Sequence, residues 1–392
     1  MIYILAFIVL IGVIVFVHEL GHYIAARSVG VGVERFSIGM PPNFVDFTKT
    51  KKGLIVDIYF FVIESKKIKW NKVYSTTLSY FNNPSETIFT IGLLPLGGYV
   101  KMKGILDESM DSKFKGDNDE LESKNSLQKI WVMSAGVIMN LVLTFFIFTL
   151  IGNLKGDTKL ENSNTTIDFI VPNQPAENAG LQVGDAFIEI EGKSVDNWNE
   201  AVEQIEKYPN ETITISFDRQ GEINKKEITL TSRPNLTTGR VDQEVGVIGI
   251  SKTQVPVELN FVESFVYGFN ETKWAMTLMT SSLKMIFQGN VSRDEVGSVI
   301  MIGDMAGQAA QAGLVPFLFL MALISVNLAY INILPIPGLD GGHIALILLE
   351  TLLGKKLSVK TRIRIQSVGM FILLSLMFFL IFNDIIRVFF SA

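Results

Sequence analysis

Long apolar runs, separated by polar stretches, are the dominant pattern of this chain. The first begins at Met1, reads MIYILAFIVLIGVIVFV, and continues through HELGHYIAA to Ala26. Three more runs lie at residues 130–152, 314–336 and 368–382, and the last reaches spanning length with the turns that follow it. Because about 20 apolar residues in a helix cross the hydrocarbon core of a bilayer, the pattern predicts four membrane-spanning helices.

The stretch between the first two runs predicts β-structure. It contains GLLPLGGYVKMKG, in which turn glycines and a proline precede the β-prone YVKM. We interpret this segment as a hairpin that dips toward the bilayer beside the first helix, and an ordinary cytoplasmic hairpin is the alternative. The charged, serine-rich residues 107–125 predict a flexible loop.

A compact domain is expected between the second and third runs. IDFIVPNQPAENAGLQVGDAFIEIEGKSV predicts a strand, a turn, a short helix ending at Gly180 and another strand. WNEAVEQIEKY predicts a helix, and ETITISFDRQGEINKKEITLT predicts a hairpin that turns at residues 219–221. This order resembles a bacterial PDZ domain, and a generic small α+β spacer is the alternative. Residues 246–250, GVIGI, line a peptide groove or form a plain closing strand.

The segment FVESFVYGFNETKWAMTLMTSSLKMIF follows this domain and is apolar enough to resemble a span. It carries Glu263, Glu271, Lys273 and Lys284. A charge at the bilayer centre costs about 2.5–3.5 kcal/mol on insertion scales. We therefore expect an amphipathic helix or helix pair at the outer membrane surface, with Trp274 at the level of the headgroups.

Composition agrees with a membrane protein. Hydrophobic residues make up 48% of the 392 residues, charged residues only 19%, and the mean hydropathy is +0.35. The chain has no cysteine, which excludes disulfides, thiolate metal sites and cysteine nucleophiles. The net charge of −5 gives no indication of a nucleic-acid partner, and we expect none.

Basic residues near the ends of the apolar runs predict the orientation of the chain. The first run lacks the basic start and the small-residue cleavage site of a secretory signal, so we expect it to be retained. Basic residues follow the first run, precede the second, and separate the third from the fourth, which predicts that these segments are cytoplasmic. The N-terminus, residues 153–313 and the C-terminus are then extracytoplasmic. The basic residues are Arg27, Arg35, Lys124, Lys129, Lys355, Lys356, Lys360, Arg362 and Arg364.

These patterns together predict an α-helical polytopic membrane protein with four transmembrane helices, a membrane-associated β-hairpin region and one extracytoplasmic α+β PDZ domain. The expected parts are a first helix (1–26), the β-hairpin region (27–127), a second helix (128–152), the PDZ domain (160–255), an amphipathic membrane-surface region (256–313), a third helix (314–352) and a fourth helix (366–390).

His18, Glu19 and His22 lie within the first apolar run and include two of the three histidines of the chain. Residues four apart share a helix face, so both imidazoles can bind one ion, and the glutamate lies about 100° away. This is the H-E-x-x-H pattern of zinc metallohydrolases. A pair of buried histidines that neighbouring polar groups satisfy is the alternative. Because ionisable residues inside a span usually mark a functional site, we favour a metal site.

A third ligand is needed, because catalytic zinc usually takes three protein ligands and keeps one position for water. The segment SVNLAYINILPIPGLDGGH, late in the third run, carries Asp340 in an apolar setting. Pro335 and Pro337 break the helix there and free backbone groups, which is tolerated at membrane depth only inside protein or beside a wet cavity. We therefore expect Asp340 to be the third ligand.

Two alternatives concern the same segment. Asp340 is also placed to act as a helix N-cap, alone or while it binds a metal. His343 competes as a ligand, but a fourth protein ligand would close the site and make it structural. We expect His343 to support the site or pack the helix.

HELGH, GLLPLGGYVKMKG, one PDZ-like segment and NLAYINILPIPGLDGGH follow one another along nearly the whole chain. This order resembles the site-2 protease family, in particular the bacterial RseP/RasP group of intramembrane metalloproteases. The resemblance implies Zn²⁺ held by His18, His22 and Asp340, with Glu19 as general base. It also implies substrate-binding residues near the broken helix and in the predicted hairpin: Asn327, Asn332, Pro335, Pro337, Gly97, Gly98 and Tyr99.

The resemblance further implies a function in regulated intramembrane proteolysis. Substrates would be single-pass membrane proteins, such as anti-sigma factors, or remnant signal peptides, cleaved in the bilayer of a bacterial plasma membrane after a first extracytoplasmic cut. The chain departs from the family pattern in SAGVIMN, which lacks a proline after its glycine but keeps Asn140. A PDZ-bearing membrane scaffold and a metal-ion transporter are the competing functions.

Overall fold

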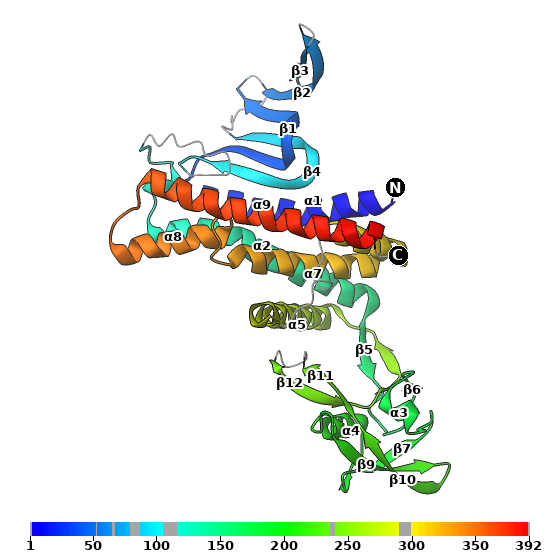
Figure 1. The fold of residues 1–392 in the computed structure, drawn as a ribbon. Coiled ribbons are helices and arrows are strands. Elements are labelled where there is room, and N and C mark those ends of the chain that lie inside the picture. Colours follow the sequence, from blue (N-terminus) through cyan, green and yellow to red (C-terminus); the bar gives the residue numbers. More distant parts are fainter. Residues whose placement is uncertain are drawn as a thin grey trace. The chain divides into compact units, whose positions relative to one another are not determined.

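The structure, a computed structural model, describes residues 2–51, 53–64, 67–78, 87–104, 116–235, 240–289 and 299–390 (Figure 1). It divides into two compact units. The first unit consists of Met1–Phe148 and Ser292–Ala392, and the second of Thr149–Val291. The residues predicted to bind metal all belong to the first unit.

Four long helices carry the apolar runs: α1 (Ile2–Ser28), α2 (Ser126–Lys155), α7 (Leu314–Ile333) and α9 (Val359–Phe390). In the part of the chain that the structure describes, these four are long and apolar enough to cross a membrane, over Val359–Phe379 in the case of α9. The four apolar runs of the sequence therefore form four helices of the length expected for spans. Their apolar residues are distributed all around the helices, as is typical of helices that meet both protein and lipid.

The third apolar run is broken, as its prolines predict. α7 ends at Ile333, and α8 (Asp340–Leu353) begins after a short turn that contains Pro335 and Pro337. Gly338 has a φ of 98° in this turn, a conformation that favours glycine. The N-cap of α8 is Leu339, so Asp340 is the first helical residue rather than the cap.

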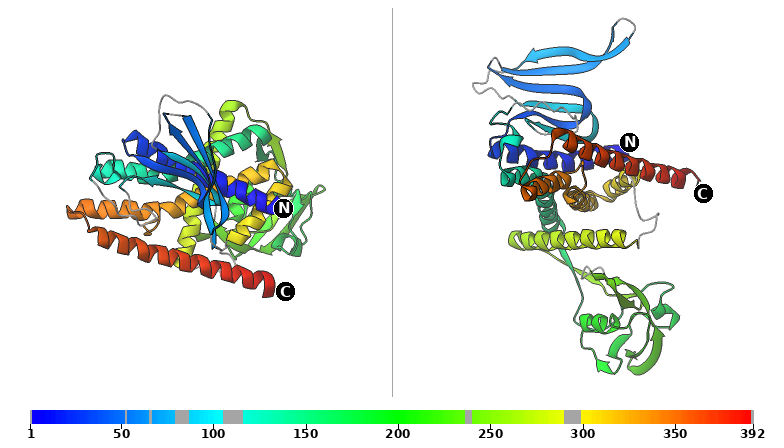
Figure 2. Two further views of the ribbon diagram at one scale, coloured as in Figure 1. Left: turned by 90° about the horizontal axis from the view of Figure 1, so that it is seen from above. Right: turned by 60° about the vertical axis from the view of Figure 1, so that its left-hand side comes forward.

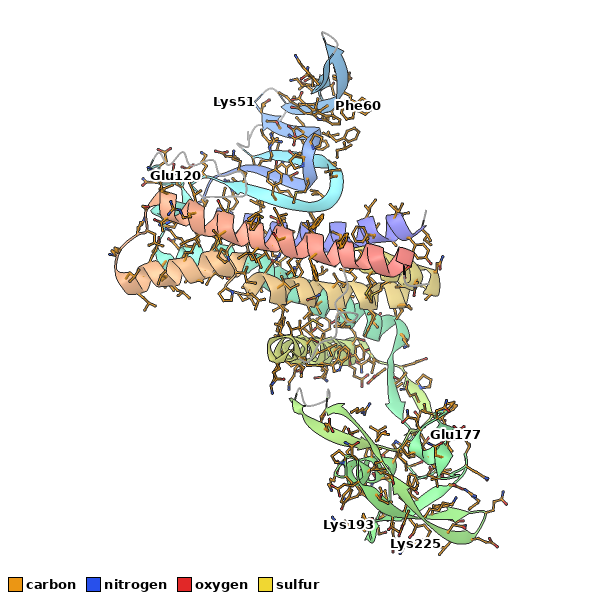
Figure 3. All side chains as sticks on the ribbon, viewed as in Figure 1. Lys51, Phe60, Glu120, Glu177, Lys193 and Lys225 are labelled. Atoms are coloured by element: carbon orange, nitrogen blue, oxygen red, sulfur yellow. The ribbon has the colours of Figure 1, made fainter. Side chains whose placement is uncertain are left out.

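A four-stranded antiparallel sheet follows α1 in the chain, with the strand order β3-β2-β1-β4. Its strands are β1 (Val33–Thr50), β2 (Gly53–Glu64), β3 (Lys67–Thr77) and β4 (Ile88–Met102). Figures 1 and 2 show β1 and β4 beside α1. Phe60, toward the far end of the β2–β3 hairpin, is 51% exposed (Figure 3).

Strands β1 and β4 are bent and interleaved, which differs from the predicted hairpin. Residues 88–91 of β4 pair with 35–38 of β1 on one side and with 45–48 of β1 on the other, while residues 98–102 pair only with 33–38. The bends require glycine, because Gly39 has a φ of 89° and a Cβ on Gly92 would lie 2.4 Å from the carbonyl oxygen of Met40. Residues 98–102 therefore form an edge of the sheet within the described residues.

One face of this sheet packs on α1 and α2. Phe36, Val100 and Met102 are buried against Ala26 and Val132 in one apolar cluster. This packing fixes the edge strand beside the histidines of α1. Of the loop predicted at 107–125, residues 107–115 lie outside the described residues, and the rest contains η1 (Leu121–Ser123) with Leu121 buried.

Helix α6 (Val299–Ala312) packs along α1. Tyr3 contacts Gly307 and donates a hydrogen bond to Gln311, whereas Phe7 faces Gly303, so the two helices run antiparallel. Glycines four residues apart allow such close helix approach. The expectation of an amphipathic membrane-surface region at 256–313 stays a prediction. Within it, α6 contacts α1 through a glycine interface that the charge pattern does not reveal.

The second unit contains a small α+β fold. Its larger sheet has the order β10-β9-β7-β8, and Phe187, Trp198, Ile215 and Phe217 are buried in its core. Its elements are β5 (Asp157–Leu160), β6 (Phe169–Ile170), α3 (Pro175–Asn178), β7 (Ala186–Ile190), β8 (Lys193–Ser194), α4 (Trp198–Ile205), β9 (Thr212–Arg219), β10 (Glu222–Thr229), β11 (Thr231–Asn235), β12 (Arg240–Val247), β13 (Ile250–Ser251) and β14 (Gln254–Val257).

The order of these elements follows the sequence prediction. A strand, a short helix, a strand, a longer helix and a hairpin succeed one another, and the hairpin turns at Gln220 and Gly221, both with positive φ. Helix α5 (Phe261–Gln288) ends the unit and begins with a capping box formed by Asn260 and Glu263. Phe261, Val266 and Phe269 of α5 are exposed.

Candidate metal centre

Two imidazoles from adjacent turns of α1 point to one place. His18 and His22 are 6% and 5% exposed, and their Nε2 atoms lie 3.2 Å apart. The i, i+4 spacing gives this arrangement on any regular helix. Neither imidazole faces solvent, so both need partners inside the protein.

The carboxylate of Asp340 completes the cluster. Its Oδ2 atom lies 3.1 Å from His18 Nε2 and 3.3 Å from His22 Nε2. The same oxygen is buried and has no hydrogen-bond partner of good geometry. In the described part of the chain, His18, His22 and Asp340 are the group of side chains that could together hold a metal ion.

The spacing of these three atoms fits zinc. Zinc binds imidazole nitrogen and carboxylate oxygen at about 2.0–2.2 Å in tetrahedral geometry, which places its ligand atoms roughly 3.3 Å apart. The three observed separations are 3.1, 3.2 and 3.3 Å. Two neutral nitrogens and one carboxylate are also a donor set that catalytic zinc sites use. The residues present therefore fit the ion, and three ligands leave a fourth position for water.

The turn between α7 and α8 places Asp340 at this point. A Cβ on Gly341 would lie 2.2 Å from the carbonyl oxygen of Ile333, so α8 begins in direct contact with the end of α7. From α9, the Gln366 side-chain oxygen accepts a hydrogen bond of 2.6 Å from the Gly338 amide. A Cβ on Gly369 would collide with the Pro337 carbonyl. Glycines and one glutamine thus hold the broken segment in place.

Helix α2 contacts both imidazoles but carries none of the three metal-site residues. The Val132 carbonyl oxygen lies 2.8 Å from His22 Nδ1, and the Asn140 side-chain nitrogen lies 3.2 Å from His18 Nδ1. Between them, a Cβ on Gly136 would lie 2.5 Å from His22 Nε2. The sequence noted Asn140 only as part of a family pattern, and nothing in the sequence indicated its contact with His18.

A cavity of about 690 Å³ opens beside the three residues. Glu19 lines it, and so do Gly98 and Tyr99 of the edge strand. Asn332 also lines it, with its side-chain nitrogen 3.3 Å from His18 Nε2. The cavity wall therefore includes the Glu19 carboxylate, the Asn332 amide and the backbone of the edge strand.

The structure gathers most of the residues predicted for the site. His18, Glu19, His22, Asp340, Asn332, Gly98 and Tyr99 line this one cavity. Asn327, Pro335, Pro337 and Gly97 are not among its described lining residues. The sequence missed Arg35, Lys101 and Met133, which also line the cavity, because their position depends on the folding of the sheet and α2.

Comparison with known proteins identifies the family. The family model of Peptidase family M50 matches residues 6–63 and 59–376. The chain belongs to peptidase family M50.

The relatives of this M50 peptidase match it along its whole length. A Campylobacter jejuni protein named as a zinc metalloprotease is 34% identical, over 98% of this chain and 93% of the relative. The zinc metalloprotease RasP of Shouchella clausii is 28% identical, over 98% of this chain and 99% of the relative. Together with the family, these relatives show that the protein is a metalloprotease that uses Zn²⁺.

Solved structures match a part of the chain. The PDZ domain of the SdrC-like protein from Listeria monocytogenes aligns with a TM-score of 0.20 and 20% identity. The alignment covers 24% of this chain and 93% of that domain.

His343 lies outside the three-residue group of the M50 site. It lines the large cavity and also a second cavity of about 50 Å³. The side-chain nitrogen of Gln366 lies 3.4 Å from both of its ring nitrogens. This position agrees with a supporting role rather than a fourth ligand, which stays a prediction.

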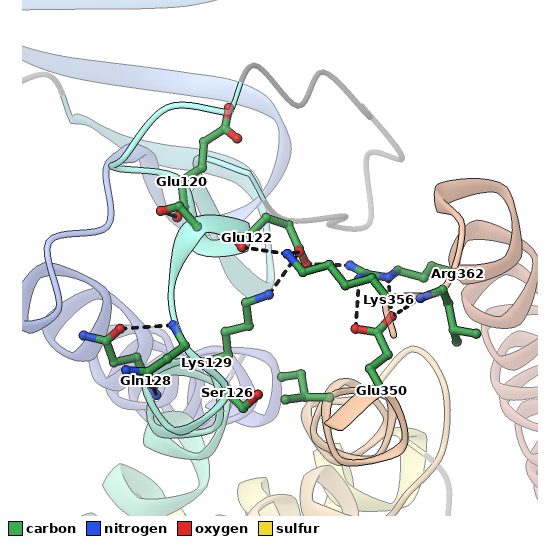
Figure 4. A network of polar contacts seen from close by, with 12 residues as sticks. Glu120, Glu122, Ser126, Gln128, Lys129, Glu350, Lys356 and Arg362 are labelled. Carbon is green, nitrogen blue, oxygen red and sulfur yellow. Dashed lines mark hydrogen bonds and ion pairs between the residues drawn. The ribbon is translucent and has the colours of Figure 1, made fainter. Parts of the chain in front are cut away.

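The second cavity borders a network of ion pairs, here called the Glu122 cluster: Glu122, Lys129, Glu350, Lys356 and Arg362. Glu122 accepts from Lys129 at 3.0 Å, Lys356 at 3.1 Å and Arg362 at 2.5 Å, and Arg362 also donates twice to Glu350 (Figure 4). Burial alone would raise the pKa of Glu122, but the hydrogen bonds and charges of Lys129 and Arg362 lower it to about 2. The cluster ties η1, α2, α8 and α9 together.

Proposed function

We propose that this M50 metalloprotease is an intramembrane endopeptidase that cuts the transmembrane segments of single-pass membrane proteins. The observation that carries the proposal is the convergence of His18, His22 and Asp340 in a cavity walled by apolar, membrane-length helices. His18 and His22 lie within α1, a helix long enough to span a bilayer, where ionisable groups are costly and usually mark a functional site. The proposed substrates are anti-sigma factors or remnant signal peptides that have already received a first extracytoplasmic cut.

In this proposal His18, His22 and Asp340 hold the zinc ion. When bound, zinc supplies a water ligand with a pKa of about 7 and polarises a substrate carbonyl. Glu19 lines the same cavity and acts as general base, taking a proton from the attacking water and returning it to the leaving amine. Asn332 donates a hydrogen bond from its side-chain nitrogen to the oxyanion or to the extended substrate backbone.

A scissile bond in a spanning helix has its carbonyl in a helical hydrogen bond, so the substrate must unwind. Residues 98–102 lie on an edge of the sheet in the described structure, and Gly98 and Tyr99 also line the cavity. A substrate segment that adds to this edge as a strand replaces its helical hydrogen bonds with intermolecular ones. Substrates with glycine, proline or other weak helix formers near the scissile bond are then cut fastest.

We further propose that residues 160–255 form a PDZ domain that controls access. Either it binds C-termini exposed by the first cut, or it obstructs bulky extracytoplasmic domains. Deleting residues 160–250 should allow untrimmed substrates to be cleaved if the domain acts as a size filter. Unchanged selectivity would count against the filter.

We also propose that the enzyme lies in the plasma membrane of a bacterium, with both termini and the PDZ domain extracytoplasmic. The basic residues at the ends of the spans support this orientation. Single cysteines introduced near Met1, into residues 196–199 and near Lys355 test this in a chain that has no natural cysteine. A membrane-impermeant thiol reagent should label the first two positions in intact cells and the third only after lysis. Labelling of the third position in intact cells would reject the orientation.

The function is tested with purified enzyme and a model transmembrane substrate, with and without a chelator. Glu19→Gln should retain zinc and lose cleavage, and added zinc should restore only the chelated wild type. A membrane scaffold would bind the substrate without cutting it. A metal transporter would move zinc into vesicles independently of Glu19. Cleavage by Glu19→Gln would remove the general-base role.

A further inference from the structure

One face of helix α2 contacts the metal centre at three positions on successive turns. Val132, Gly136 and Asn140 are spaced four residues apart, matching the spacing of His18 and His22 on α1. Val132 contacts one imidazole through its carbonyl, Asn140 contacts the other through its side chain, and Gly136 lies against both. This face of α2 therefore touches both histidines.

The chemistry of a neutral imidazole defines what this face must provide. Both histidines direct Nε2 toward Asp340, so each must carry its proton on Nδ1 if Nε2 is to bind a metal. His22 Nδ1 lies 2.8 Å from the carbonyl oxygen of Val132, which can only accept. That contact fixes the metal-binding tautomer of His22 without any side chain of α2.

Within the described residues, His18 Nδ1 contacts the Asn140 side chain instead of a backbone carbonyl. The Asn140 side chain is fully buried, its Nδ2 lies 3.2 Å from His18 Nδ1, and its Oδ1 is buried with no hydrogen-bond partner. A 180° rotation of the amide exchanges oxygen and nitrogen without changing the shape of the side chain. The oxygen then accepts from His18 Nδ1–H, which gives the orphaned acceptor a partner and leaves Nε2 free for the metal.

The surrounding contacts hold Asn140 at this position. Its backbone carbonyl accepts hydrogen bonds from Thr144 of the next turn and from Ser325 of α7, both at 2.9 Å. Thr144 is also 3.3 Å from the Ala322 carbonyl. Because α2 is clamped to α7 at the residue that contacts His18, the amide has a fixed place from which to orient the imidazole.

We propose that Asn140 is a positioning residue that selects the metal-binding tautomer of His18 through its side-chain oxygen. The inference rests on the proposed zinc site formed by His18, His22 and Asp340. A ligand histidine commonly donates its second N–H to a carboxylate, carbonyl or water, and loss of that partner typically lowers metal affinity 10–100-fold. In this site the Asn140 amide would accept the Nδ1 proton of His18, and the Val132 carbonyl would accept that of His22.

The affinity of the full-length protein for zinc tests the proposal without reference to proteolysis. Metal-free wild type, Asn140→Leu, Asn140→Asp and Thr149→Val are titrated with zinc against a competing chelator in detergent. Asn140→Leu should bind zinc 10–100-fold more weakly, whereas Asn140→Asp, which keeps an acceptor oxygen, should bind at least as tightly as wild type. Thr149→Val is the matched control, buried on α2 more than two turns beyond Asn140, and should stay within twofold.

Nuclear magnetic resonance of ¹⁵N-labelled histidine provides a second readout, and it needs only the wild-type protein. The chain has only three histidines, so three imidazoles appear in the spectrum. In the zinc-loaded wild type, His18 and His22 should both carry the proton on Nδ1. A proton on His18 Nε2, or coordination of zinc through His18 Nδ1, would overturn the proposal even if Asn140→Leu failed to fold.

The outcomes separate this inference from the proposed function. Wild type that binds no zinc would reject the proposed site itself. Wild type that binds zinc, with equal affinity in a folded Asn140→Leu variant, would reject only the role of Asn140. Equal weakening in Asn140→Leu and Thr149→Val would assign the effect to packing of α2, and would also reject the role of Asn140.

Discussion

The metal centre and the Glu122 cluster are both groups of mostly buried polar side chains in the first unit, with Lys356 as the exposed member, but their charges are balanced differently. In the Glu122 cluster two carboxylates meet three cationic side chains, and each carboxylate has partners between 2.5 and 3.1 Å. In the metal centre a carboxylate oxygen and two imidazole nitrogens converge with no cationic lysine or arginine in the three-residue group. The Glu122 cluster is balanced by its own side chains, whereas the metal centre is balanced in our proposal by a bound zinc ion.

The difference has a physical consequence for mutation. Removing a member of the Glu122 cluster leaves a partner charge partly buried and lowers stability. Removing one of the three metal-site side chains leaves fewer hydrogen-bond acceptors close together in the metal-free protein. The main effect is therefore a lower affinity for metal. Each prediction below tests one side of this comparison.

Asp340→Asn should have the largest effect. An amide has the size of the carboxylate but no charge, so zinc occupancy should collapse and cleavage should fall about 10³-fold or more, with little change in the melting temperature of the metal-free protein. Zinc content, cleavage rate and thermal unfolding check this. Asp304→Asn on the exposed face of α6 is the matched control, and full zinc occupancy in Asp340→Asn would contradict the assignment.

Gly136→Ala should come next. The added methyl would lie 2.5 Å from His22 Nε2 and 2.6 Å from His18 Nε2, so α1 and α2 must separate or the imidazoles must rotate. We expect zinc affinity to fall at least about tenfold, since misplaced ligands bind metal poorly. Gly12→Ala on α1 is the control, because a Cβ there meets nothing within 4 Å. Equal zinc affinity in both variants would show that the close approach of α2 is unimportant.

Glu122→Gln should reduce stability rather than activity. The folded pKa of about 2 lies below the unfolded value of 4.5, so the stabilisation is complete above about pH 4.5 and is lost as the pH falls toward 2. At pH 7 the variant should unfold with about 1–3 kcal/mol less free energy than wild type. The gap should narrow below pH 4.5 in thermal or denaturant unfolding. A difference in unfolding free energy between wild type and variant that is constant from pH 7 to pH 3 would refute the ionic origin of the stabilisation.

Lys356→Ala should have the smallest effect. Its side chain is 65% exposed, and exposed ion pairs are worth about 0–1 kcal/mol. Lys129, only 8% exposed, contacts the same carboxylate and should cost clearly more when replaced by methionine. Comparable losses in the two variants, measured by unfolding at low salt, would mean that burial does not set the strength of this cluster.

The residues of the metal centre could be predicted because local rules determine them. The His18–His22 spacing fixes a shared helix face, and Asp340 stands out as a carboxylate beside two prolines in an apolar run. The order of elements in the second unit was also predictable, since each strand, helix and turn has its own local pattern.

Features that depend on distant pairing were not predictable. Strand β4 joins both halves of β1 because Gly39 and Gly92 bend the two strands against each other, and no local pattern encodes that partnership. The antiparallel packing of α6 on α1 depends on glycines that match Tyr3 and Phe7 across the interface. The contact of Asn140 with His18 likewise follows from the register of α2 against α1.

The central claim is that residues from both ends of the chain hold one zinc ion through two imidazoles and one carboxylate. X-ray absorption at the zinc edge of the loaded wild type and of Asp340→Asn tests it most directly. The account predicts one zinc per chain with two imidazole nitrogens and two oxygens, one from Asp340 and one from water, at about 2.0–2.2 Å. A first shell with a single imidazole, or one unchanged in Asp340→Asn, would contradict it.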